Sequence, residues 1–170
     1  LDYAISSVSR IDAFIDAIRI KFKPERDDFL YRTENQNLLF FLAFYTGEVV
    51  GRAIGVPPQW LSYREATQIA LDHENMFSEC METSVCCRYP GNTTLEIDFF
   101  HPLYAIVTRL LDGNAGKSIR CSAGLFLTGE LDSEPLAGEP TPPFVPGLFG
   151  EGEFFQSKGI GCNYAMIRPW

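Results

Sequence analysis

Lysine and arginine are missing from two long stretches of this 170-residue sequence, residues 65–87 and residues 121–157. These stretches contain five and six acidic residues, and the whole chain has a formal net charge of −8. Proteins hold the phosphates of nucleic acids mainly with lysine and arginine, so this composition argues against nucleic acid as a partner. The same charge favours a basic protein partner, although acidity that only maintains solubility gives the same composition.

The cysteines do not form the pattern of a disulfide framework. There are five, an odd number; two are adjacent, and none belongs to a Cys-x-x-Cys pair. We therefore expect buried free thiols in a reducing cytoplasm. No signal peptide is visible, although the sequence starts at Leu1 and a removed leader stays an open alternative. The five cysteines are Cys80, Cys86, Cys87, Cys121 and Cys162.

The sequence also lacks an apolar run long enough to cross a bilayer, so we expect no membrane span. Its most apolar segment, residues 38–54, is typical of the central buried helix of a domain, and we predict that helix over residues 35–54. Gly47 and Gly51 lie four residues apart, on one side of the predicted helix, where they allow another element to approach closely. The prolines after Gly55 end the helix.

One acid and one base interrupt this apolar segment. Glu48 precedes Arg52 by four residues, which is the favourable order for an ion pair along a helix. A charge in so apolar a helix needs a partner, so we predict a largely buried structural ion pair between Glu48 and Arg52. A polar functional site lined by Tyr45, Glu48 and Arg52 remains the alternative.

The hydrophobic periodicity predicts an α+β fold, in which N-terminal helices pack on an antiparallel sheet. Apolar residues recur with helical spacing over residues 7–22 and 102–111. Residues 82–89 and 93–100 are rich in β-branched and aromatic residues and flank a Pro-Gly-Asn turn, which predicts a hairpin. The remaining predictions are one or two short strands within 60–71, a polar connection over 25–37, and either a helix or a strand over 118–128.

The end of the chain differs in composition, because five of the eleven prolines lie between Pro135 and Pro146. We divide the chain into an α+β core, residues 1–129, and a Pro/Gly-rich arm with a final strand, residues 130–170, packed on the same single domain. Long irregular segments are often functional, and apolar anchors beside acids predict a partner-binding surface here. A lid folded back over the sheet is the alternative. The predicted partner-binding residues are Glu139, Phe144, Leu148, Phe149, Glu151 and Glu153.

No strong catalytic, metal or nucleotide motif is present, and we expect neither a cofactor nor a bound metal. The segment Gly116-Lys117-Ser118 resembles the end of a phosphate-binding loop but lacks the glycine that should stand five residues earlier. Neither histidine has a second ligand at a zinc-binding spacing. A thiol nucleophile would need Cys86 or Cys87 beside His101, and neighbouring strand residues point to opposite faces, so at most one of the two can face it.

The segment Tyr45-Thr46-Gly47-Glu48-Val49, followed by Arg52 and Trp60, resembles a helix of small uncharacterised bacterial proteins. The resemblance covers residues 1–113 loosely, and it departs from the pattern at Ala43, where a glycine is usual. This family has no agreed activity, so the resemblance assigns no catalytic residue. Some of its relatives look like immunity proteins beside secreted toxins, which implies an inhibitory role.

These observations together predict an acidic cytosolic protein-binding domain, most concretely an immunity-type inhibitor of a bacterial toxin. The expected partner is a basic protein. One alternative is a small enzyme with a thiol or metal centre near Cys86, Cys87 and His101, and another is a structural domain of unknown function. The oligomeric state stays open.

Overall fold

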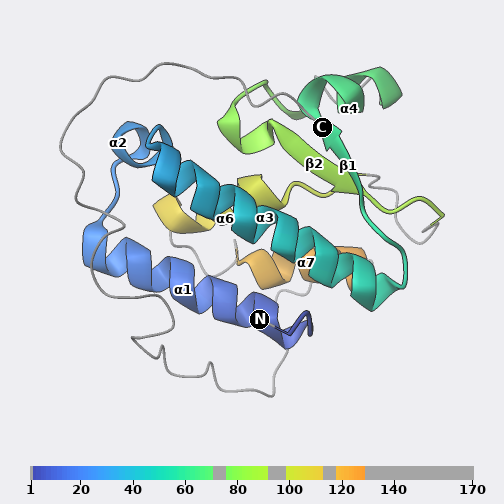
Figure 1. The fold of residues 1–170 in the computed structure, drawn as a ribbon, viewed down its shortest axis with the longest axis horizontal. Coiled ribbons are helices and arrows are strands. Elements are labelled where there is room, and N and C mark those ends of the chain that lie inside the picture. Colours follow the sequence, from blue (N-terminus) through green and yellow to red (C-terminus); the bar gives the residue numbers. More distant parts are fainter. Residues whose placement is uncertain (1, 71–75, 92–98, 113–117, 129–170) are drawn as a thin grey trace.

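The computed structural model describes residues 2–70, 76–91, 99–112 and 118–128, and the statements below concern these residues. They form helices around one central helix, with a small sheet at one side (Figure 1). The elements are α1 (Ser6–Phe22), α2 (Arg26–Leu30), α3 (Thr33–Ile54), β1 (Gln59–Ser62), α4 (Tyr63–Ile69), the 3-10 helix η1 (Met81–Thr83), β2 (Val85–Arg88), α6 (Pro102–Asp112) and α7 (Ile119–Thr128).

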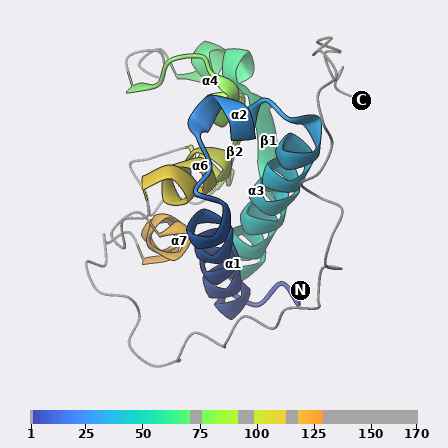
Figure 2. The same cartoon turned by 90° about the vertical axis from the view of Figure 1, so that its left-hand side faces the viewer.

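The core lies between the four longest helices. Helix α3 packs against α6, α7 and α1, and α1 in turn contacts α6 and α7 (Figure 2). The predicted helices over 7–22, 35–54 and 102–111 are confirmed within two residues at each end. The side chains that fill the space between them are aliphatic, as the helical periodicity requires. The largest fully buried ones include Ile15, Leu39, Leu103, Ile106, Leu110 and Ile119.

The sheet is antiparallel and pairs β1 with β2, with Trp60 opposite Cys87 and Leu61 opposite Cys86. On its other side β2 forms an antiparallel bridge between Cys87 and Phe100. The α+β class is therefore confirmed, with a sheet of two strands packed against the helices. Of the second strand of the predicted hairpin, residues 93–100, the part over 93–98 lies outside the described residues.

Two sequence predictions need correction, those for residues 25–37 and for the start of the hairpin. The predicted polar connection over residues 25–37 contains α2 and the first turn of α3. Of the one or two short strands predicted within residues 60–71, one is confirmed as β1, and Ser62 and Glu65 form a capping box that begins α4 directly after it. The first predicted hairpin strand begins as η1, and β2 starts only at Val85. Residues 118–128, open between helix and strand, form α7.

Helix α3 is longer than the apolar run that predicted it. With 22 residues, α3 is long and apolar enough to cross a membrane by length and composition. The shortness of the apolar run in the sequence therefore does not by itself exclude a membrane span. Half of its most apolar window is buried inside this domain, which is also what a core helix shows. The expected absence of a membrane span and the expected cytoplasmic location stay predictions.

Candidate functional site

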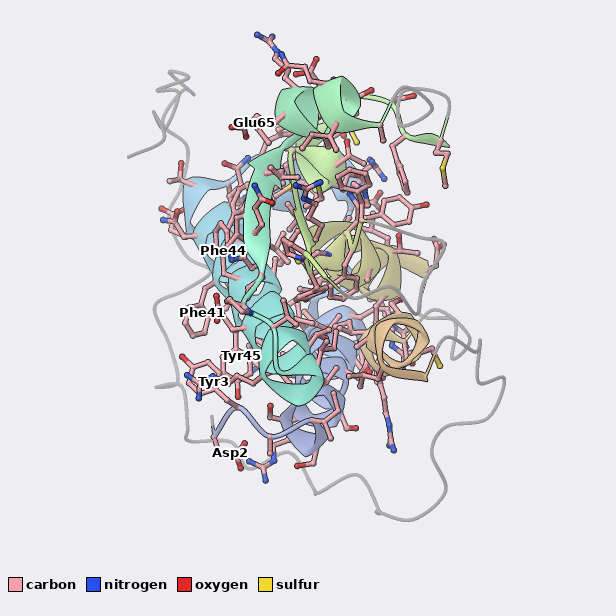
Figure 3. The ribbon with its side chains drawn as sticks, turned by 90° about the vertical axis from the view of Figure 1, so that its right-hand side faces the viewer. Asp2, Tyr3, Phe41, Phe44, Tyr45 and Glu65 are labelled. Carbon is pink, nitrogen blue, oxygen red and sulfur yellow. The ribbon has the colours of Figure 1, made fainter. Side chains whose placement is uncertain are left out.

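Large aromatic side chains point outward from one side of α3, although most of the helix is buried. Phe41 is 50% exposed, Phe44 is 41% exposed, and Tyr3 from the N-terminal segment, 39% exposed, lies beside them. Figure 3 shows these three rings and Tyr45 along the same side of the molecule. We define the aromatic face as Tyr3, Phe41, Phe44, Arg52 and Trp60.

Gly47 sets the position of Trp60 on this face. A Cβ atom on Gly47 would lie 2.4 Å from Cη2 of Trp60, so the indole packs directly against the helix backbone. The Trp60 and Phe44 rings form a T-shaped contact at a centroid distance of 4.6 Å, and Trp60 Nε1 donates a long hydrogen bond, 3.5 Å, to Oε1 of Glu48. The predicted close approach is thereby confirmed, and at Gly51 a Cβ would lie 2.8 Å from Pro58 Cδ.

Tyr3 is fixed by backbone and side-chain contacts. Its φ is +56°, in the left-handed region that residues other than glycine rarely adopt. The Tyr3 N–H donates to Tyr45 Oη at 2.9 Å, and that hydroxyl donates to Ser7 Oγ at 2.9 Å. The two tyrosine rings lie 4.9 Å apart. A constrained N-terminal segment thus extends the aromatic face beyond α3 itself.

The predicted buried ion pair between Glu48 and Arg52 is not what the structure contains. Arg52 is exposed, and its guanidinium carbon lies 3.9 Å from the centroid of the Tyr3 ring. Glu48 is half-buried and accepts the hydrogen bond from Trp60. Among the described residues these two side chains form no ion pair with each other. The guanidinium of Arg52 instead lies over the ring of Tyr3, whose quadrupole attracts a cation.

Three acidic side chains in residues 65–87 form hydrogen bonds or ion pairs within the domain. Glu65 accepts from the Ser62 N–H at 2.7 Å, and this backbone hydrogen bond chiefly lowers the pKa of its carboxyl. Glu79 pairs with Arg64 at 3.6 Å on the surface. Glu82, only 4% exposed, pairs with Arg26 of α2. This stretch therefore offers a partner less free negative charge than its sequence suggests.

The six predicted partner-binding residues lie outside the described residues. They are Glu139, Phe144, Leu148, Phe149, Glu151 and Glu153. The prediction that they contact a partner stays a prediction, as does the division of the chain at residue 129. The sequence prediction placed the binding surface on one of the two base-free stretches, 65–87 or 121–157, with the second preferred, and it missed the aromatic face. The sequence marks Phe41 and Phe44 only as apolar residues of α3, and their exposure is visible only in the folded structure.

The two adjacent thiols are poorly suited to nucleophilic chemistry. Cys86 faces Leu61 and Ala66, whereas Cys87 faces the main core, as expected for neighbours on a strand. Burial raises the pKa of each thiol to about 12, whereas a reactive cysteine needs a lowered pKa. His101 is buried against Phe77, with ring centroids 4.2 Å apart. Across the described ranges, no cluster of three or more potential metal ligands is present.

The N-terminus of α7 follows the sequence that resembles a phosphate-binding loop. A carboxylate of the protein occupies this helix end, because the N–H groups of Ile119 and Arg120 donate to Oδ1 and Oδ2 of Asp12 at 2.8 and 3.1 Å. Burial raises the pKa of Asp12 against the opposing effect of these hydrogen bonds. Arg109 also approaches Asp12, at 3.9 Å. This helix end is thus satisfied internally, and helix α6 rather than a strand precedes it.

Comparison of the chain with protein-family models, with curated proteins and with solved structures finds no match. The resemblance to small bacterial proteins therefore stays an expectation.

Proposed function

We propose that this protein is a protein-binding domain and that the aromatic face of α3 is its docking surface. One observation carries the proposal: Tyr3, Phe41 and Phe44 are each between 39% and 50% exposed on one side of the molecule. Exposed apolar patches that are continuous mark interaction sites more often than isolated exposed residues do. Aromatic residues and arginine are also the types enriched at protein interfaces.

The rings of the aromatic face are held in place before any partner binds. Phe41 stacks on Tyr45 at a centroid distance of 6.5 Å, and Phe44 contacts Trp60. Tyr3 lies under Arg52. Side chains that are already ordered lose little conformational entropy on binding, so more of their contact energy appears as affinity. The arrangement suits a few aromatic anchors that carry most of the binding energy.

We propose that the partner is a basic protein and that the domain acts as an immunity-type inhibitor of a bacterial toxin. The net charge of −8 supports this choice, because it steers a basic protein toward the domain. Such steering acts mainly on the association rate and weakens as salt is added. The aromatic face would then hold the complex together. Buried, protonated thiols give no support to the alternative of a thiol enzyme.

The test is quantitative affinity capture with the full chain in extracts of its native host. The variant Phe41→Ala with Phe44→Ala removes two rings from the face. The matched control, Tyr31→Ala with Tyr104→Ala, removes two aromatic side chains that are 49% and 46% exposed elsewhere. We expect a partner that the wild type and the control retain and the face variant loses. A partner retained equally by all three proteins contradicts the proposal.

A further inference from the structure

A carboxylate lies among the rings of the aromatic face. Glu48 follows Phe41 by seven residues and Phe44 by four, a spacing that places all three on one side of α3. It is half-buried, and its Oε1 accepts the hydrogen bond of 3.5 Å from Trp60 Nε1. Within the described part of the chain Glu48 forms no ion pair. An ionised carboxylate accepts about four hydrogen bonds, so the described residues use little of this capacity.

A partner that covers the rings of Phe41 and Phe44 also takes water away from Glu48. In the free protein, water can satisfy the acceptor capacity that Trp60 leaves unused. A wholly apolar partner surface would bury the carboxylate without a counter-charge, which is strongly unfavourable. The docking surface therefore selects a partner that brings a cationic hydrogen-bond donor to this position.

We propose that the partner protein places the guanidinium of an arginine against Glu48 and the neighbouring rings of Phe44 and Trp60. This inference rests on the proposed function, because it names the partner group that the same surface recognises. A guanidinium is planar, donates two parallel hydrogen bonds to a carboxylate and stacks on aromatic rings. The ammonium of lysine is a compact, strongly hydrated charge that does not form such a fork, so arginine fits this combination better.

Arg52 supports the chemistry and also opposes part of the charge. Its guanidinium carbon lies 3.9 Å from the centroid of the Tyr3 ring, so this surface already holds one guanidinium on an aromatic ring. Arg52 follows Glu48 by four residues, and its charge repels a second cation. Because it stacks on Tyr3 and forms no ion pair with Glu48, the carboxylate keeps its hydrogen-bonding capacity for the partner. Removing the charge of Arg52 should therefore strengthen the binding of an arginine.

The experiment titrates capped tripeptides into the full chain at low salt and follows the fluorescence of Trp60. Replacing the only other tryptophan by Trp170→Phe makes Trp60 the sole reporter. The probes are acetyl-Gly-X-Gly-amides in which X is arginine, lysine or citrulline, the neutral isostere of arginine. We expect a saturable change with the arginine peptide, roughly tenfold weaker binding of the citrulline peptide, and intermediate binding of the lysine peptide.

Protein variants locate the charge that the arginine peptide recognises. Glu48→Gln should weaken its binding roughly tenfold. The matched control is Glu34→Gln, which makes the same change in net charge at an exposed acid in the first turn of the same helix, and it should bind as the parent chain does. Arg52→Gln should strengthen binding roughly twofold. Melting temperatures establish that each variant is folded.

Several results overturn the inference. One is the absence of saturable binding of the arginine peptide. A second is equal binding of the arginine and citrulline peptides, and a third is an equal loss in Glu48→Gln and Glu34→Gln, which would mean that net charge alone attracts the peptide. Lysine binding as tight as arginine binding would contradict the assignment of a guanidinium.

Partner capture separates this inference from the proposed function. We expect Glu48→Gln to capture less partner than Glu34→Gln does. Capture that depends on Phe41 and Phe44 but not on Glu48 contradicts only the inference. Capture that ignores Phe41 and Phe44 contradicts the proposed function, whatever the peptide titrations show.

Discussion

The two sides of α3 contain equally apolar residues but have different surroundings. On the inner side Leu39, Ala43 and Val50 are at most 1% exposed and pack against other helices. On the outer side Phe41 and Phe44 are about half exposed and contact neighbouring rings. Hydrophobicity therefore identifies α3 as the organising helix without saying which of its residues the fold needs. The inner side stabilises the domain, and the outer side, which we propose as the docking surface, leaves its rings partly exposed.

The largest difference should appear when one residue on each side is truncated. Leu39→Ala leaves a cavity between α3 and the other helices, so we expect it to lower the free energy of unfolding by about 2–5 kcal/mol. Phe41→Ala removes a ring that is half in water, and we expect a loss below about 1 kcal/mol. Urea unfolding followed by circular dichroism measures both. Similar losses for the two variants would mean that the sides are not distinct.

Gly47 lies between the two sides, because it supports Trp60 on the aromatic face. A Cβ there would overlap the indole, and we expect Gly47→Ala to destabilise by about 1–3 kcal/mol and to shift the Trp60 emission. The control is Gly124→Ala in α7, where a Cβ would meet no atom of the described residues within 4 Å. That change should be neutral or stabilising by up to about 1 kcal/mol. An unchanged emission spectrum in Gly47→Ala would show that Trp60 does not pack on this glycine.

The buried thiol of Cys87 should make the free energy of unfolding depend on pH. Burial raises the pKa of its thiol from 9.0 to about 12 in the folded state, so the folded protein holds this proton more tightly than the unfolded chain. Its contribution to stability is therefore complete below pH 9 and is lost as the pH rises from about 9 to 12. Between pH 8 and pH 10 we expect stability to fall by about 1 kcal/mol less in Cys87→Ala than in the wild type. Equal pH slopes would indicate an accessible thiol.

Glu48 should have the smallest effect. The buried ion pair expected from the sequence would have made Glu48→Ala cost about 3–5 kcal/mol. In the structure Glu48 is half-buried and accepts one long hydrogen bond from Trp60, so we expect a loss below about 1 kcal/mol. The comparison is Arg52→Ala, which should likewise have little effect on the melting temperature. A large loss of stability in both variants would instead support the buried ion pair between Glu48 and Arg52.

The helices that organise the domain were predictable because their information is local. Apolar spacing located α1, α3 and α6, and the capping box of Ser62 and Glu65 was a readable signal for α4 that was missed. The cap that Asp12 supplies to α7 was not predictable, because it joins residues 107 positions apart. The aromatic face was missed for the same reason. Periodicity marks Phe41 and Phe44 as apolar, and only the tertiary arrangement shows that no described element covers them.

The most direct test of the outer side is site-specific photocrosslinking in the native host. The photoreactive residue p-benzoylphenylalanine replaces Phe41 in one full-length protein and Tyr104, which is similarly exposed on α6, in another. We expect the probe at position 41 to form a discrete adduct with a partner protein, and the probe at position 104 to form none. Absence of an adduct at position 41, or the same adduct at both positions, would contradict the assignment of this face as a docking surface.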